Sequence, residues 1–262
     1  MTARKGTASL TGRRALVVGG SAGIGRGIAW AWARAGADVV VCSRNAPEEP
    51  GGPEGPGAGA LTWRGLDLAD PDQTRVTLAD LGSAPLDLVC YSAVHYGRRR
   101  AALCDVHEEE WRRQFEVNTA GLRLTLAATL PALRAAAPGL FVGVSSEVAF
   151  NAGPGRSGYA ASKAAAKVLL DSVAQEEDPA QVRIVQVLPE GMVDTPGIRR
   201  RRSPGFDYAA YMRPEAFARV AVELALATGP GHHGDSLVVG GDGSWWPVRV
   251  RAPRSQSGTP HR

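Results

Sequence analysis

Residues 15–25 read Ala15-Leu16-Val17-Val18-Gly19-Gly20-Ser21-Ala22-Gly23-Ile24-Gly25, a short apolar run that enters a glycine-rich turn. Beyond the turn, apolar residues recur at helical spacing as far as Ala35, and Gly36 is a suitable C-cap. Glycines at such a junction let the backbone turn sharply and approach a pyrophosphate, to which the first helical turn offers free N–H groups. Spaced glycines alone are weak evidence in a chain with 32 glycines, and a tight turn that merely requires glycine is the alternative. The flanking strand and helix favour a phosphate-binding junction.

Strand-like apolar runs and helix-period stretches alternate along the whole chain. The expected strands are 15–18, 39–42, 86–91, 140–144, 183–188 and 236–239, with 61–64 a weaker candidate, and the expected helices are 24–35, 71–81, 108–137, 159–177 and 214–227. Strands that alternate with helices form right-handed βαβ units around a parallel sheet. The sequence therefore predicts an α/β fold, a single domain over 10–245 with helices on both faces of a parallel sheet.

Four segments lie outside this alternation. Residues 46–59 contain four prolines and five glycines, so we expect a mobile loop where a crossover helix would normally lie. Residues 1–9 and 246–262 are expected to be flexible tails, the second rich in Pro, Ser and Arg. Residues 190–213 are expected to form a lid over the substrate.

The composition excludes several classes of protein. With 262 residues, 44% hydrophobic and 21% charged, the chain is long and apolar enough for a buried core. Its net charge of +4 comes partly from arginine runs, but no nucleic-acid-binding signature accompanies them, so no nucleic acid is expected as a partner. The three cysteines lack paired or metal-ligand spacing, which predicts free thiols and no metal site. Without a signal-peptide core or a long apolar run, the chain is expected to be cytoplasmic, with no membrane association.

The end of the second strand indicates which dinucleotide would bind. An acidic residue here would hydrogen-bond the adenosine ribose and favour NAD, whereas this chain has Ser43 and Arg44, donors suited to a 2′-phosphate. NADP(H) is therefore predicted over NAD(H), and a merely solvated Arg44 is the alternative. Asp67, after the third strand, is expected to accept from the adenine amino group unless it only caps a turn.

A group of polar residues follows the expected strand at 140–144. Ser146 comes directly after this strand, and Tyr159 and Lys163 lie four residues apart, on one face of the next helix. Carbonyl reduction needs a proton for the developing alkoxide, and a nearby ammonium brings the pKa of a tyrosine down from about 10 toward the working range. Ser146 is expected to hold the substrate oxygen, and Asn118 to anchor a water beside Lys163. Each residue has a structural alternative by itself, but their order behind the glycine turn favours catalysis.

Together these features resemble the short-chain dehydrogenase/reductase family, from about Leu10 to Gly243. The family's glycine motif matches at Gly19, Gly23 and Gly25, and its Ser–Tyr–Lys triad and asparagine match at Ser146, Tyr159, Lys163 and Asn118. The resemblance implies a single-domain Rossmann fold, with a doubly wound sheet of seven strands in the order 3-2-1-4-5-6-7. It also implies a homo-oligomer, a dimer or tetramer built on two long central helices. The cofactor contacts that it implies are Gly19, Ser21, Gly23, Ile24, Gly25, Ser43, Arg44, Asp67, Leu68, Ser92, Ala93, Tyr159, Lys163, Val193 and Thr195.

Three positions depart from the family's pattern. Val18 stands where threonine is usual. Tyr91-Ser92-Ala93-Val94 replaces Asn-Asn-Ala-Gly, a segment that normally supports the glycine loop, which leaves the local backbone path open. Glu190 replaces a proline, and its carboxylate either lies in solvent, the favoured interpretation, or meets a cationic group on the substrate.

The predicted function is NADP(H)-dependent reduction of a ketone, a biosynthetic intermediate, with Tyr159 as proton donor. An alcohol dehydrogenase working in the oxidative direction and a non-catalytic nucleotide sensor are the alternatives. The carbonyl or alcohol substrate is expected to bind among residues 94–100, 147–158 and 192–212, because loops carry specificity. The last segment joins arginines 199–202 to several aromatic residues. It is interpreted as a solvated lid, or, less favourably, as one that closes over a substrate or docks an acidic carrier protein.

Overall fold

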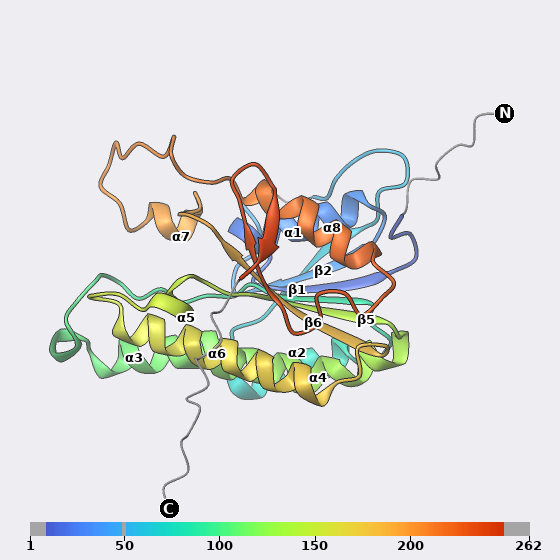
Figure 1. Ribbon diagram of the computed structural model, residues 1–262, viewed down its shortest axis with the longest axis horizontal. Helices are drawn as coiled ribbons and strands as arrows, with labels where there is room; N and C mark the ends of the chain where they lie inside the picture. Colours follow the sequence, from blue (N-terminus) through green and yellow to red (C-terminus); the bar gives the residue numbers. More distant parts are fainter. Residues whose placement is uncertain (1–8, 49–50, 249–262) are drawn as a thin grey trace, which may run out of the picture.

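The computed structural model describes residues 9–48 and 51–248 and is built on an eight-stranded sheet in the order β3-β2-β1-β4-β5-β6-β7-β8 (Figure 1). The strands are β1 (Arg14–Val18), β2 (Asp38–Ser43), β3 (Leu61–Gly65), β4 (Leu88–Tyr91), β5 (Gly139–Val144), β6 (Val182–Pro189), β7 (Ser236–Val239) and β8 (Trp245–Pro247). All neighbouring strands are parallel except β7 and β8, which are antiparallel.

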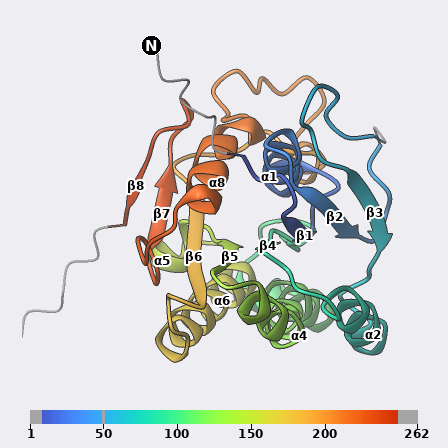
Figure 2. The same cartoon turned by 90° about the vertical axis from the view of Figure 1, so that its right-hand side faces the viewer.

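Helices cover both faces of the sheet (Figure 2). They are α1 (Gly23–Arg34), α2 (Pro71–Leu81), α3 (Glu108–Phe115), α4 (Gly121–Ala136), α5 (Val148–Asn151), α6 (Ser157–Glu176), α7 (Pro196–Arg199) and α8 (Phe217–Leu226), with short η1 (Leu103–Asp105), η2 (Glu116–Ala120) and η3 (Pro214–Ala216) segments. Helices α1 and α8 pack on one face, and α2, α4 and α6 pack on the other. The predicted doubly wound Rossmann-type fold is confirmed.

The predicted count of seven strands was one too few. A turn after β7 closes with a hydrogen bond of 2.8 Å from Gly240 N to the Ser244 carbonyl, and the chain returns antiparallel as β8. Asp242 stabilises this turn by accepting from the backbone N–H and the hydroxyl of Ser244. Trp246 and Pro247, predicted as part of the tail, therefore belong to the sheet. Residues 1–8 and 249–262 lie outside the described residues.

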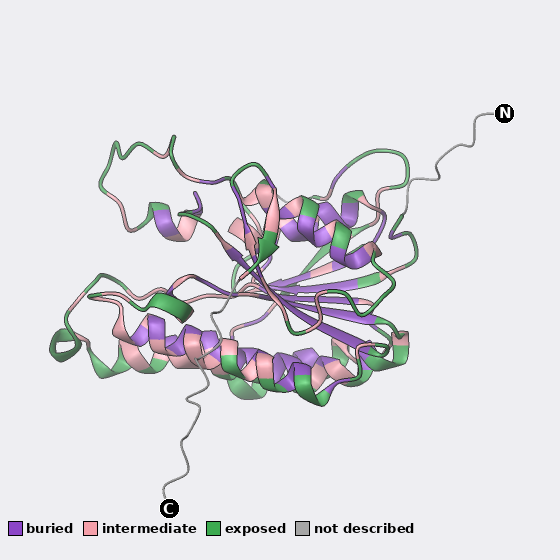
Figure 3. Ribbon diagram, in the orientation of Figure 1, coloured by how far each residue is buried: buried purple, intermediate pink, exposed green. Residues whose placement is uncertain are grey.

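The buried core has two layers because strand side chains alternate between the faces of the sheet (Figure 3). In β1, Ala15 and Val17 join the cluster under α1 and α8, whereas Leu16 and Val18 join the cluster over α2, α4 and α6. Trp32 on α1 is fully buried, and its indole N–H donates to the Ala221 carbonyl of α8 at 3.0 Å. This packing holds α1 against α8 on one face of the sheet.

The long helix predicted over 108–137 is interrupted in the structure. Helix α3 passes through one π-helical turn, η2, before α4 begins. The buried hydroxyl of Tyr91 donates to the Val117 carbonyl within η2. A π-turn widens the helix by one residue and is common at functional sites, and here it places Asn118 in the interior with an exposure of 1%.

The described residues between β2 and β3 form no helix or strand, so 46–48 and 51–59 are a loop, as predicted, in the place where a crossover helix would normally lie. The mobility of this loop stays a prediction. Two of the three free cysteines, Cys42 and Cys90, are buried in β2 and β4, and burial raises the pKa of the Cys42 thiol to about 12. Throughout 9–48 and 51–248, helices long and apolar enough to span a bilayer are absent, as are clusters of side chains suited to a metal ion.

Candidate active site

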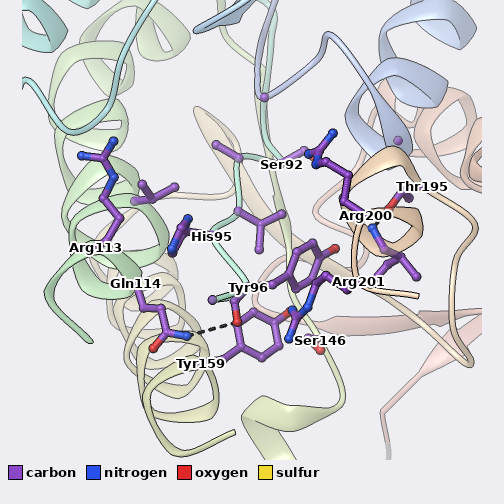
Figure 4. Close-up of a pocket in the computed structure, with 18 of the residues that line it drawn as sticks. Ser92, His95, Tyr96, Arg113, Gln114, Ser146, Tyr159, Thr195, Arg200 and Arg201 are labelled. Carbon is purple, nitrogen blue, oxygen red and sulfur yellow. Dashed lines mark hydrogen bonds between the residues drawn. The ribbon is translucent and has the colours of Figure 1, made fainter. Parts of the chain in front are cut away.

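A cavity of about 1660 Å³ opens where the carboxyl ends of the parallel strands meet. Residues at or just after the ends of β1, β2, β3, β4, β5 and β6 line it, as Val18, Ser43, Leu66, Ser92, Val144 and Pro189 show. In open α/β sheets this edge is the usual place for a ligand. Figure 4 shows the part of the cavity that contains Ser146 and Tyr159, two of the residues predicted to be catalytic.

The glycine turn forms one wall of the cavity. Gly19 has φ +84°, and a Cβ there would lie 2.3 Å from the Ala93 nitrogen. Gly23 has φ +58°, and a Cβ there would lie 3.0 Å from Thr195 Cγ2. Both positions therefore require glycine for conformation as well as for space. Ser21 and Ile24 line the cavity beside them, whereas Gly25 lies behind the turn, with room only for a hydrogen next to the Gly19 carbonyl. The turn fits the pyrophosphate of a dinucleotide.

The unusual segment after β4 still supports this turn. Ser92 N donates to the Val18 carbonyl at 2.8 Å, and the backbone of Ser92 and Ala93 contacts Gly19. Ser92, Ala93 and Val94 all line the cavity. The replacement of the family's Asn-Asn-Ala-Gly thus leaves the brace under the glycine turn in place.

The adenosine side of the cavity is lined by Ser43, Arg44, Asp67 and Leu68. The Ser43 hydroxyl donates to the Asn45 carbonyl at 2.8 Å and accepts from the indole of Trp63 at 3.0 Å, so both of its roles are occupied. Arg44 is exposed and has no ion pair with the described residues. Asp67 accepts from the Ala69 N–H at 3.1 Å, which is the turn cap named as the alternative to its adenine contact. Arg44 is therefore the donor available to a phosphate.

The predicted triad comes together at the far wall. Ser146 follows β5, and its hydroxyl is hydrogen-bonded to Tyr159 on α6 and donates to a Glu147 carboxylate oxygen at 2.9 Å. Burial, followed by the nearby Tyr96, raises the pKa of Tyr159, so its phenol is protonated at neutral pH. Lys163 is buried and donates from Nζ to the Val144 carbonyl at 2.9 Å, and burial lowers its pKa to about 8.

Asn118 lies one layer behind the cavity and does not line it. Its side chain accepts from His95 N at 2.7 Å and donates to the His95 carbonyl at 3.0 Å and to Ser162 Oγ at 2.9 Å. The amide thus ties the segment after β4 to helix α6. Its predicted role as a water ligand stays a prediction.

A second cavity, of about 10 Å³, lies behind Lys163 and is lined also by Asn118, Ser145 and Gln186. Ser145 Oγ and Gln186 Oε1 are buried and lack hydrogen-bond partners among the described residues. A space of this size with several polar groups suits one water molecule. Such a water would connect Lys163 to Gln186, whose amide donates to Asp171 at 2.7 Å.

The lid segment is joined at its base by a parallel bridge between Val193 and Met212. Val193 and Thr195 line the cavity, as predicted for the nicotinamide side, and Thr195 caps helix α7. Beyond residue 202 the lid turns away, because Phe206, Tyr208 and Tyr211 pack on one another with centroids 4.9–5.6 Å apart. Of the predicted pocket segments, residues 94–100, 147, 155–158, 192–193, 195–198 and 200–202 line the cavity, whereas the aromatic part of the lid does not. That the substrate binds among them stays a prediction.

Several pocket residues were not singled out by the sequence. Tyr96 packs against Tyr159 with ring centroids 5.3 Å apart, and its hydroxyl is hydrogen-bonded to Thr195. Glu147 pairs with Arg156 at 3.2 Å. They fall in the predicted pocket segments but belong to no motif. Glu190, by contrast, is exposed and lies outside the cavity lining, in line with the favoured interpretation.

Comparison with known proteins agrees with this geometry. A family model described as short chain dehydrogenase matches residues 13–204. A 2-keto-3-deoxy-L-fuconate dehydrogenase of Xanthomonas campestris is 28% identical over 90% of this chain and 81% of its own. An uncharacterized NAD-dependent oxidoreductase of Mycobacterium tuberculosis is 32% identical over 86% of this chain and 92% of its own.

Among solved structures, a putative NAD(P)-dependent gluconate 5-dehydrogenase from Beutenbergia cavernae with bound NADP superposes with a TM-score of 0.74. It is 26% identical, covering 91% of this chain and 98% of its own. The family model spans most of the chain and reaches from the strand before the glycine turn past the Ser–Tyr–Lys residues. The chain belongs to the short-chain dehydrogenase/reductase family and is an NAD(P)-dependent oxidoreductase acting on C=O or CH–OH groups.

Proposed function

We propose that the protein is an NADPH-dependent ketone reductase in which Tyr159 donates the proton. The observation that carries this proposal is the arrangement of Tyr159, Ser146 and Lys163 on one wall of the large cavity, with the glycine turn on the opposite side. A protonated phenol beside a serine hydroxyl suits an incoming carbonyl oxygen, because the phenol can donate to it and Ser146 can do so when its hydroxyl turns from Glu147 to the substrate.

Ser146, Tyr159 and Lys163 have different roles in the proposed reaction. Ser146 positions the carbonyl oxygen, and Tyr159 Oη transfers its proton to that oxygen as the alkoxide develops. NADPH, when held between the glycine turn and this wall, would supply the hydride for the carbonyl carbon. Lys163, as an ammonium, stabilises the phenolate that Tyr159 becomes, and a water in the small cavity behind it can return the proton.

The choice of NADPH over NADH rests on Arg44. It stands at the carboxyl end of β2 on the wall of the cavity, with its guanidinium unpaired among the described residues, and a 2′-phosphate would meet its charge. No acidic side chain takes the ribose-binding place beside it, since the neighbouring residue is Ser43. The predicted cytoplasmic location, homo-oligomer and carrier-protein partner stay predictions.

The proposal is tested by assaying NADPH oxidation over a panel of ketones, and NADP⁺ reduction over the matching alcohols, with NADH and NAD⁺ in parallel. Turnover of at least one ketone, with higher kcat/KM for NADPH than for NADH, supports it. Tight NADPH binding without turnover in either direction would refute it and favour the nucleotide sensor. Turnover confined to alcohols would refute the reductive assignment.

A further inference from the structure

Arginine dominates the charge of the large cavity. Ten arginines and Lys163 line it, against six carboxylates. Two of the arginines, Arg26 and Arg44, lie on the cofactor side near the glycine turn and the end of β2. The others come from α3 and from the loops expected to hold the substrate, so the substrate half of the cavity is also positively charged.

Of the arginines that line the cavity, Arg201 is the one best placed to bind a substrate. It follows α7, is partly buried, and its guanidinium carbon lies 5.6 Å from the centroid of the Tyr96 ring. Burial raises the pKa of both Tyr96 and Tyr159, and the charge of Arg201 acts on both phenols and offsets part of this rise. Figure 4 shows it reaching toward these two rings and Ser146. A group bound by Arg201 would therefore lie beside the reacting carbonyl.

No described carboxylate neutralises Arg201. The nearest acidic residue of the catalytic wall, Glu147, is already occupied by Arg156 at 3.2 Å and by the Ser146 hydroxyl at 2.9 Å. Asp194 of the lid, likewise, is held by Arg199 at 2.6 Å. Arg201 thus presents its N–H donors to the cavity with their charge uncompensated.

Other arginines increase this charge. Arg100, from the loop after β4, and Arg202 both repel the Arg201 guanidinium and, together with its burial, lower its pKa. Arg202 is oriented by two hydrogen bonds to the Tyr211 hydroxyl, at 3.1 and 2.9 Å. Like charges drawn from two separate loops and left unpaired are stabilised when an anion enters between them.

We propose that Arg201, assisted by Arg100, binds an anionic group of the substrate, a carboxylate or a phosphate, next to the carbonyl that Tyr159 protonates. This inference rests on the proposed function for the identity of the site and adds the class of substrate. The favoured substrates are keto acids or phosphorylated ketones, and the neutral analogue of each should be a poorer substrate because a partly buried guanidinium would lose its partner.

The kinetic test compares ketones that have an anionic group with neutral analogues of the same ketone. Levulinate is compared with methyl levulinate, and dihydroxyacetone phosphate with dihydroxyacetone, at saturating NADPH. In Arg201→Gln, kcat/KM for the anionic member should fall about tenfold to a hundredfold, while the neutral member changes less than about threefold. Arg201→Lys should recover part of the lost kcat/KM, because lysine keeps the positive charge but lacks the planar set of N–H donors of the guanidinium. The substrate pair whose anionic member is affected by Arg201→Gln shows whether the site binds a carboxylate or a phosphate. Arg75→Gln, the same change on exposed α2 outside the cavity, is the control.

A binding test separates this inference from the proposed chemistry. Succinate, inorganic phosphate and neutral succinamide are titrated by calorimetry into Tyr159→Phe saturated with NADPH, in which turnover is not needed. The anion site is supported if one anion binds saturably and succinamide does not. This binding should be lost when Arg201→Gln is added and kept when Arg75→Gln is added, and the result holds even if no ketone is reduced. Absence of anion binding, binding that survives Arg201→Gln, or an Arg201→Gln effect confined to NADPH affinity would overturn it.

Discussion

Replacing Gly19 by alanine separates the conformational role of this glycine from its role in close packing. Gly19 has φ +84°, a conformation that costs an L-residue about 1–2 kcal/mol. The new Cβ would also lie 2.3 Å from the Ala93 nitrogen, so the backbone of the turn or of its brace must move. Overpacking of this kind typically costs about 1–3 kcal/mol more. Gly19→Ala is expected to lower the free energy of unfolding by roughly 2–5 kcal/mol in total.

Gly12 provides the matched control. It has nearly the same φ, +81°, but a Cβ there would meet nothing within 4 Å. Gly12→Ala should therefore lose only the conformational part, about 1–2 kcal/mol, and bind NADPH normally. Urea denaturation measures the first quantity, and fluorescence titration with NADPH measures the second. Since a displaced turn no longer aims its N–H groups at the pyrophosphate, Gly19→Ala should bind NADPH at least about tenfold more weakly. Equal stability losses for the two variants, or unchanged NADPH affinity in Gly19→Ala, would refute the reasoning.

Three further predictions concern the cofactor and the catalytic wall. Arg44→Asp should weaken NADPH binding about tenfold to a hundredfold, measured by titration, with a much smaller effect on NADH; equal losses would contradict the assignment. Burial lowers the pKa of Lys163 to about 8, so the ammonium is lost as the pH rises through that value. Accordingly, kcat/KM for NADPH in ketone reduction should fall above about pH 8, and Lys163→Arg should move this limb upward; a profile that stays flat to pH 10 argues against it. Tyr91→Phe leaves the Val117 carbonyl without its donor and should lower the free energy of unfolding by about 1–3 kcal/mol in urea melts, whereas unchanged stability would mean that water replaces the hydroxyl.

Most of the fold follows from short-range patterns. The helix predicted over 71–81 is present with the same limits, because Asp70 caps its first turn and proline starts it. A bend or break of this helix near Thr119 and Gly121 is expected from the sequence, but the π-helical form of η2 is not, since it depends on the Tyr91 hydroxyl, which comes from a strand far away in the sequence. Strand β8 was missed because its three residues, Trp245–Pro247, show no alternation and take their place only by pairing with β7.

The residues of the candidate site, too, were predicted where a local sequence pattern fixes them and missed where tertiary structure does. Tyr159, Lys163 and the glycine turn could be predicted because they are fixed by spacing within one helix and one turn. Ser146 could be predicted as well, because it comes shortly after strand β5. The roles of Tyr96 and Arg201 depend on how separate loops meet over the cavity, and no local pattern encodes that meeting. The sequence located the loops that carry specificity but not the side chains that face the substrate.

Tyr159 is proposed to supply the proton for carbonyl reduction and is only one of many expected contacts to NADPH. The most direct test measures NADPH affinity and single-turnover ketone reduction side by side in the wild type and Tyr159→Phe. We expect NADPH affinity to fall by less than about tenfold and the rate of hydride transfer to fall by about a hundredfold or more, in the range that general acid catalysis contributes. A Tyr159→Phe enzyme that reduces the ketone at the wild-type rate would contradict the proposed role of Tyr159.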